Sequence, residues 1–137
     1  MPLILSADSR TTAGILLLTV VAIEYGGWFM LRVIRGRQPA KPFQQAFFRA
    51  GHAHAGVLVI LSLISQIYVD AAHLSGLVAI LARDGIPAAA ILMPAGFFFA
   101  AAGREVMKPN KFIWLIYAGI VALGLGVISL GIGLLTA

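Results

Sequence analysis

Residues 112–135, FIWLIYAGIVALGLGVISLGIGLL, decide the fold class of this chain. They contain no charged side chain, and about 20 predominantly apolar residues are enough for a helix to cross the hydrocarbon core of a bilayer. A run of this length and composition is typical of a transmembrane helix rather than of a buried helix in a soluble domain. The sequence therefore predicts an integral membrane protein.

The whole chain has the composition of a membrane protein. Of its 137 residues, 61% are hydrophobic and only 11% are charged, whereas soluble domains average about 45–50% apolar and about 25% charged residues. The net charge of +5 comes from cations beside the apolar runs, which favours the lipid bilayer over nucleic acid as the partner. The absence of cysteine excludes disulfides, iron–sulfur clusters and cysteine nucleophiles.

Three further apolar runs complete an all-α bundle of four transmembrane helices, which we expect to form one domain over residues 1–137. The predicted spans are residues 13–34, 47–72, 86–103 and 112–135. Residues 75–85 are partly apolar but too few to cross the membrane, so we expect a short interfacial helix or a helix extension before the third span. Pro87 would then lie in the first turn of that span, and Pro94 would kink it.

Positive charge is concentrated on one side of these spans. Two of the ten cations, Arg10 and Arg83, lie on one side. The other eight lie in or beside the first and third connectors: Arg32, Arg35, Arg37, Lys41, Arg49, Arg104, Lys108 and Lys111. The positive-inside rule then predicts a protein of the cytoplasmic (inner) membrane, with both termini on the outer side and these two connectors in the cytoplasm.

Small residues recur on one face of each of the last two spans. Close approach of helices in lipid depends on such residues, so we expect these faces to contact each other or a second copy of the chain. The fourth span has Gly119, Ala122, Gly126, Ser129 and Gly133, and the third has Ala89, Gly96, Ala100 and Gly103, with Met93 at the remaining position.

The second span carries a polar stripe. Residues three, four and seven apart share a helix face, and within about 140° of arc lie Gln45, Arg49, His52, Ser62, Gln66, Asp70 and His73. Each ionisable group would cost a few kcal/mol if it faced lipid, so we expect the stripe to face protein or water. At its end, an ion pair between Asp70 and His73 is the simplest interpretation, and a metal site completed by Asp84 is the alternative.

Glu24 is the only acid in the interior of the first span. Because the first two helices run antiparallel, its depth should match that of His52 and His54. A carboxylate and an imidazole offset the cost of burying each other, so we expect Glu24 to contact one of these histidines. The two histidines point about 160° apart on a regular helix, so they cannot chelate one ion together unless Gly51 and Gly56 permit a distorted backbone.

Residues 47–58, FFRAGHAHAGVL, resemble the His-x-His helix openings of small bacterial four-span membrane proteins and of distant relatives of haem-copper oxidase subunit I. The resemblance covers this run alone, and the further helices and histidines of the oxidases are missing. It implies that His52 or His54 ligates haem or a metal ion.

Three functions remain open at this point, and none of them decides whether the chain is an enzyme. The first is binding of a transition metal ion or haem b by Glu24, His52 and His54. A metal site needs three or four ligands, and a bis-histidine haem would need a homo-oligomer, since all three histidines lie on one helix. The second is an accessory role in a larger membrane complex. The third is translocation of protons or a small solute along the polar stripe, with Glu24 as the protonatable group.

Overall fold

The computed structural model describes residues 4–137, which form four helices. These are α1 (Ala7–Ile34), α2 (Pro42–Ala71), α3 (Gly76–Ala100) and α4 (Ile113–Thr136). All four are long and apolar enough to cross a membrane. The predicted all-α membrane fold is therefore confirmed.

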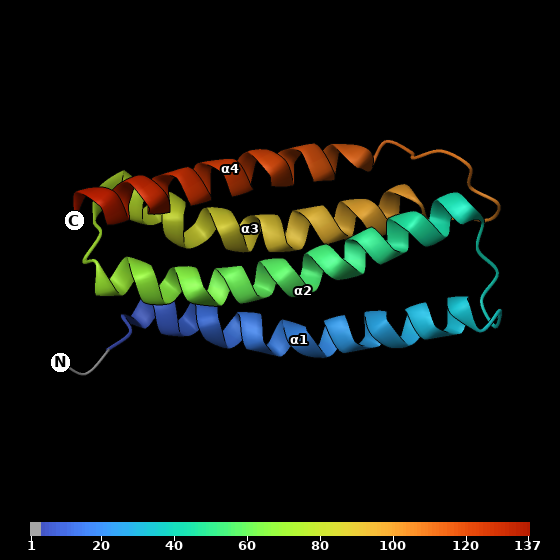
Figure 1. Ribbon diagram of the computed structural model, residues 1–137, viewed down its shortest axis with the longest axis horizontal. Coiled ribbons are helices and arrows are strands. Elements are labelled where there is room, and N and C mark those ends of the chain that lie inside the picture. Colours follow the sequence, from blue (N-terminus) through green and yellow to red (C-terminus); the bar gives the residue numbers. More distant parts are fainter. Residues whose placement is uncertain (1–3) are drawn as a thin grey trace.

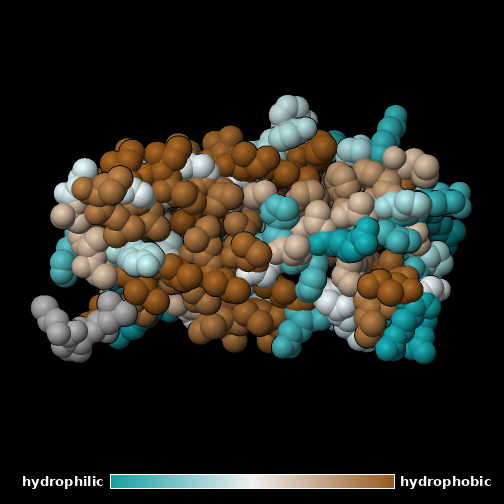
Figure 2. All heavy atoms as spheres, viewed as in Figure 1, coloured by the Kyte–Doolittle hydropathy of each residue, from teal (hydrophilic) through white to brown (hydrophobic). Residues whose placement is uncertain are grey.

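The helices lie antiparallel and side by side (Figure 1). The start of α1, the α2–α3 turn and the end of α4 lie at one end, here called the terminal end, and the α1–α2 and α3–α4 connectors lie at the connector end. α3 packs against both α2 and α4, whereas α1 packs chiefly against α2 and is the least buried helix. On the face seen in Figure 2, hydrophobic atoms cover most of the bundle and hydrophilic atoms gather toward the connector end.

α1 and α2 begin earlier than the predicted spans at residues 13 and 47. The hydroxyl of Ser6 caps α1 by accepting a hydrogen bond from the backbone N–H of Ser9 at 3.2 Å. Pro42 opens α2, at a position where its missing N–H costs no helical hydrogen bond. Both helices therefore extend past the hydrocarbon-spanning part.

α3 is one continuous helix, so residues 76–85 extend the third span and do not form a separate interfacial helix. Pro87 lies in the middle of the helix rather than in its first turn. It cannot donate a hydrogen bond to the carbonyl of Arg83, but the side-chain Nε2 of Gln66 in α2 donates to that carbonyl at 2.9 Å. Ile86 beside it is fully buried. Contacts with neighbouring helices thus hold the segment helical.

The small-residue faces of α3 and α4 contact each other, as predicted. A Cβ added at Gly96 would lie 2.6 Å from Cγ1 of Ile116, and one at Gly126 would lie 2.9 Å from Cγ1 of Ile86. Gly119 adjoins Met93 in the same way. This packing makes α3 and α4 the tightest pair of the bundle.

Gln44 joins the start of α2 to the α3–α4 connector. Its buried Nε2 donates to the carbonyls of Ala101 at 2.9 Å and Gly103 at 3.0 Å. Next to it, the rings of Phe48 and Phe98 stack with their centroids 5.6 Å apart. The connector end of α2 and α3 is therefore fixed by both polar and aromatic contacts.

Candidate functional site

An apolar groove, here called the α1–α3 groove, lies between α1 and α3 with α2 as its floor. Its volume is about 330 Å³. It follows α1 from Thr12 to Gly26, a length of about 21 Å at 1.5 Å per residue. Its walls are Thr12, Ile15, Leu16, Thr19, Ala22, Ile23 and Gly26 of α1, His52, Ala55 and Val59 of α2, and Pro87, Ala90, Ile91, Pro94 and Phe98 of α3.

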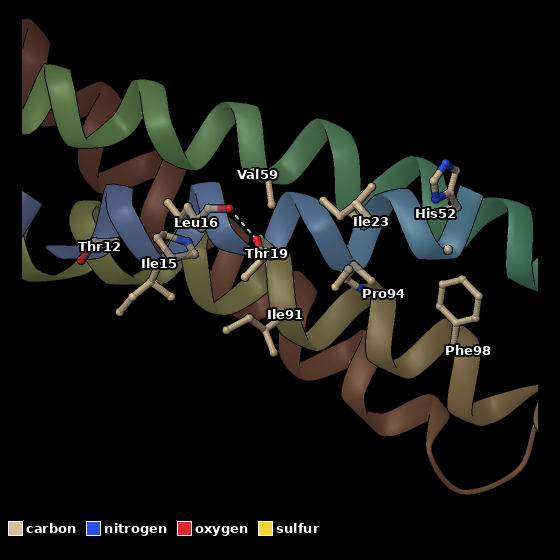
Figure 3. A pocket seen from close by; sticks show the side chains of 15 residues that line it. Thr12, Ile15, Leu16, Thr19, Ile23, His52, Val59, Ile91, Pro94 and Phe98 are labelled. Atoms are coloured by element: carbon tan, nitrogen blue, oxygen red, sulfur yellow. Dashed lines mark hydrogen bonds between the residues drawn. The ribbon is translucent and has the colours of Figure 1, made fainter. Parts of the chain in front are cut away.

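Few polar groups reach this groove. Figure 3 shows His52 and Phe98 at one end and Thr12 at the other. The hydroxyl of Thr19 donates to the carbonyl of Leu16 at 2.6 Å and is already satisfied. The groove is therefore a hydrocarbon-like slot with one imidazole near the connector end.

Thr12 also lines a second cavity at the terminal end, with a volume of about 340 Å³. The walls of that cavity are polar and include Asp8, Arg83 and Asp84. The α1–α3 groove therefore adjoins a polar opening at one end and the imidazole at the other.

His52 is the only ionisable side chain among the residues that line the groove. The half-buried ring packs on the backbone of α1, so that a Cβ added at Gly26 would lie 3.3 Å from its Nδ1 and one at Gly27 would lie 3.4 Å from its Cε1. Among the described residues, neither ring nitrogen has a hydrogen-bond partner, in contrast to the ring of His54. The donor and the acceptor of a neutral imidazole are therefore not used by the described residues.

His54 lies outside the groove. Its Nδ1 is 2.7 Å from the carbonyl oxygen of Ala50, and its ring packs on Phe97 of α3 with a centroid separation of 4.9 Å. The two histidines contact different helices, as the two-residue spacing predicted.

The expected contact between Glu24 and a histidine is not formed. Gly26 and Gly27 adjoin His52, so the predicted depth is right to within one helical turn. Glu24 itself is exposed, and in the part of the chain that the structure describes it makes no ion pair. The imidazole packs on the two glycines because they present no side chain, and the acid falls on another face of α1.

The described residues, 4–137, contain no group of three or more His, Asp or Glu side chains placed to hold a metal ion. Glu24, His52 and His54 each have a different environment. A metal ion or haem bound by these residues stays a hypothesis.

The polar stripe of α2 has no single environment. Arg49 is exposed, whereas Ser62 and Gln66 are fully buried. The Ser62 hydroxyl donates to a main-chain carbonyl of α2 at 2.7 Å, and the Gln66 amide to one of α3 at 2.9 Å. Apolar Val59 lies between Ser62 and His52 on the groove side. Of these two buried groups, Gln66 joins α2 to α3, whereas the Ser62 bond stays within α2.

Asp70 pairs with Arg83 of α3 rather than with His73, so the predicted pair is wrong. Its Oδ1 lies 3.0 Å from Nη2 of Arg83, and its Oδ2 accepts the backbone N–H of Ser6 at 2.7 Å. α2 ends at Ala71, and His73 has a φ of 51° in the turn, so helical spacing no longer relates the two residues. The signal that sequence reasoning missed is Arg83, which lies two turns into the helix after a short turn and so returns to the level of Asp70.

No family model, curated protein or solved structure matches this chain. The interpretation of the α1–α3 groove therefore depends on its own geometry and chemistry.

Proposed function

We propose that this protein binds an elongated, lipid-soluble molecule in the α1–α3 groove, with the imidazole of His52 as the contact for its polar group. The observation that carries the proposal is the His52 ring, which lines an apolar groove while both nitrogens lack a partner in the described residues. Small-molecule sites are typically concave and mostly apolar, with a few polar groups that fix orientation.

The shape of the groove favours a chain-like ligand. It extends about 21 Å along α1, which is more than half of the roughly 30 Å hydrocarbon core. Its walls carry methyl, methylene and ring groups, with the hydroxyls of Thr12 and Thr19 among them. A long hydrocarbon or isoprenoid chain matches the apolar part of these walls.

The chemistry of the groove favours a neutral head group. The residues that line the groove include no Lys or Arg to pair with an anion, which would lose its hydration there. A carbonyl or hydroxyl, as in a quinone, accepts or donates one hydrogen bond and matches what His52 offers. A bare metal ion is less well matched, because the groove supplies one nitrogen ligand and no carboxylate.

Haem b is the second candidate for the same site. A single unpartnered imidazole in an apolar slot is the kind of ligand that haem iron takes, and the groove would then hold part of the macrocycle. The optical spectrum separates the two ligands, since haem gives a Soret band and a quinone does not.

The test is ligand binding to the purified full-length protein in detergent. Decylubiquinone and haemin are titrated separately into the wild type, His52→Ala and His54→Ala. We expect His52→Ala to weaken binding of one ligand about tenfold, the value of one hydrogen bond of about 1.4 kcal/mol, and His54→Ala to leave it unchanged. Equal binding by wild type and His52→Ala, or equal loss in both variants, would refute the proposal.

We also propose that the connector end faces the cytoplasm. The α1–α2 and α3–α4 connectors carry most of the Lys and Arg residues, which supports this orientation through the positive-inside rule. The chain contains no cysteine, so single-cysteine variants Gly36→Cys and Ser75→Cys report sidedness cleanly. In intact cells an impermeant maleimide should label Ser75→Cys and spare Gly36→Cys, and the opposite pattern would reverse the orientation.

A further inference from the structure

Two charged side chains of α1 and α2, Glu24 and Arg49, are exposed and unpaired. Among residues 4–137 neither forms an ion pair. Glu24 lies ten residues, or about 15 Å, from the connector end of α1, and α1 is about 42 Å long in all. It therefore lies inside the hydrocarbon layer, where a lipid-facing acid is unfavourable.

Both residues lie on the side of the α1–α2 pair that faces away from the groove. Ala22 and Gly26 of α1 line the groove, and Glu24 is two residues, or about 200°, from each of them. On α2, Ala55 lines the groove and lies about 60° from His52 around the helix axis. Arg49 lies about 60° from His52 in the opposite direction, away from the groove. Glu24 and Arg49 thus share one exposed surface, here called the α1–α2 face.

The two charges lie at similar depths. Gly26 and Gly27 are level with His52. Counting from that contact, Glu24 lies toward the terminal end and Arg49 toward the connector end, with an axial offset of about 8 Å. Because the Cβ atom of each residue tilts toward the N-terminus of its own helix, the long arginine side chain must turn back toward Glu24 to close this offset.

We propose that the α1–α2 face is the interface with a second copy of this chain, closed by two reciprocal ion pairs between Glu24 of one copy and Arg49 of the other. A two-fold axis parallel to the helices sets α1 of each copy against α2 of the second and keeps every residue at its own depth. Each acid then meets a base, and Glu24 no longer faces lipid.

Small residues on α2 allow the backbones to approach at this face. Ala53 is exposed and lies one turn beyond Arg49. A Cβ added at Gly56 would meet no atom within 4 Å, so the space beside it is open. Small residues at helix contacts are what association in lipid requires. The opposite charges and the small residues of this face therefore both favour a second copy of the chain as the partner.

The experiment exchanges the two charges between copies. Full-length chains carrying Glu24→Arg or Arg49→Glu are expressed alone or together with different affinity tags, and pairing is measured by pulldown from mild detergent and by energy transfer in liposomes. Each variant alone should lose homodimer at least about tenfold, because like charges meet. Co-expression should restore the mixed dimer to the wild-type level, since both reciprocal pairs then form again.

Two results would overturn the proposal. One is a wild type that is monomeric in liposomes at the protein-to-lipid ratio used. The other is failure of the mixed variants to pair although each retains helical circular dichroism, which is the result expected if the two residues pair within one chain. Glu105→Arg makes the same charge change at an exposed residue of the connector and should leave dimerisation unchanged. Ligand titration of His52→Ala is independent of this outcome.

Discussion

The α3–α4 pair and the α1–α3 pair differ in the residues that face the neighbouring helix. Gly96, Gly119 and Gly126 bring α3 and α4 into backbone contact. Between α1 and α3, the branched side chains of Ile23 and Ile91 line an open groove instead. In lipid, where apolar surface alone drives little association, small residues decide which helices approach closely. One pair is therefore the scaffold, and the other leaves room for a ligand.

The largest loss of stability is expected when the contacts of Asp70, which join α1, α2 and α3 at the terminal end, are removed. Asp70→Ala leaves the largely buried guanidinium of Arg83 with only the exposed carboxylate of Asp8, 3.9 Å away, and removes the acceptor for the Ser6 N–H. We expect a loss of about 2–4 kcal/mol in the free energy of unfolding, measured by denaturation in detergent. His73→Ala is the control and should cost little; an equal loss would restore the Asp70–His73 interpretation.

Crowding the α3–α4 contact should have the next largest effect. Gly126→Ala places a Cβ 2.9 Å from the backbone nitrogen of Ile86, so a helix must shift, at a cost of about 1–3 kcal/mol. Gly124→Ala in the same helix meets no atom within 4 Å. It should be neutral or slightly stabilising, because alanine favours a helix over glycine. Equal melting temperatures for the two variants would contradict the tight packing inferred here.

Filling the α1–α3 groove should affect binding without affecting stability. Ala22→Phe places a ring in the groove and should weaken decylubiquinone or haemin binding at least about tenfold, equivalent to about 1.4 kcal/mol. Val21→Phe adds the same ring at an exposed position outside the groove and should leave affinity unchanged. Both variants should keep the wild-type melting temperature; loss of binding in Val21→Phe as well would argue against this groove as the site.

The smallest effect is expected at the connector end. Lys41 and Glu105 form an ion pair of 3.3 Å with both side chains well exposed. Exposed pairs contribute about 0–1 kcal/mol, so Glu105→Ala should change the unfolding free energy by less than about 0.5 kcal/mol. A larger loss in a thermal melt would mean that the Lys41–Glu105 pair stabilises the connector more than an exposed ion pair does.

Much of the fold was predictable because apolar runs and small-residue spacing are local properties of the sequence. The continuity of α3 was not, because the carbonyl freed by Pro87 finds its donor in Gln66 on another helix. From sequence alone, a proline indicates the end of a helix unless that distant hydrogen-bond donor is known. The partner of Asp70 was missed for a similar reason, since it depends on how the α2–α3 turn brings Arg83 back alongside α2.

The level of Glu24 relative to His52 along the bundle was predictable, but the face of α1 on which Glu24 lies was not. Counting residues along two antiparallel helices placed Glu24 near the level of His52, and Gly26 and Gly27 indeed adjoin that ring. Which face of α1 meets α2 is decided by where the backbone is least obstructed, and this is at the two glycines. His52 therefore lines an apolar groove, and Glu24 is exposed on another face.

Nitrogen-15 NMR of the imidazole rings of His52 and His54 in the purified protein is the sharpest test of ligand binding in the α1–α3 groove. Decylubiquinone and haemin are added in separate titrations, and His52→Ala and His54→Ala distinguish the signals of these two rings from those of His73. We expect one of these ligands to shift or broaden the ring-nitrogen signals of His52 saturably, while the signals of His54, whose Nδ1 contacts the Ala50 carbonyl, stay in place. No change at His52 with either ligand, or equal changes at both rings, would contradict it.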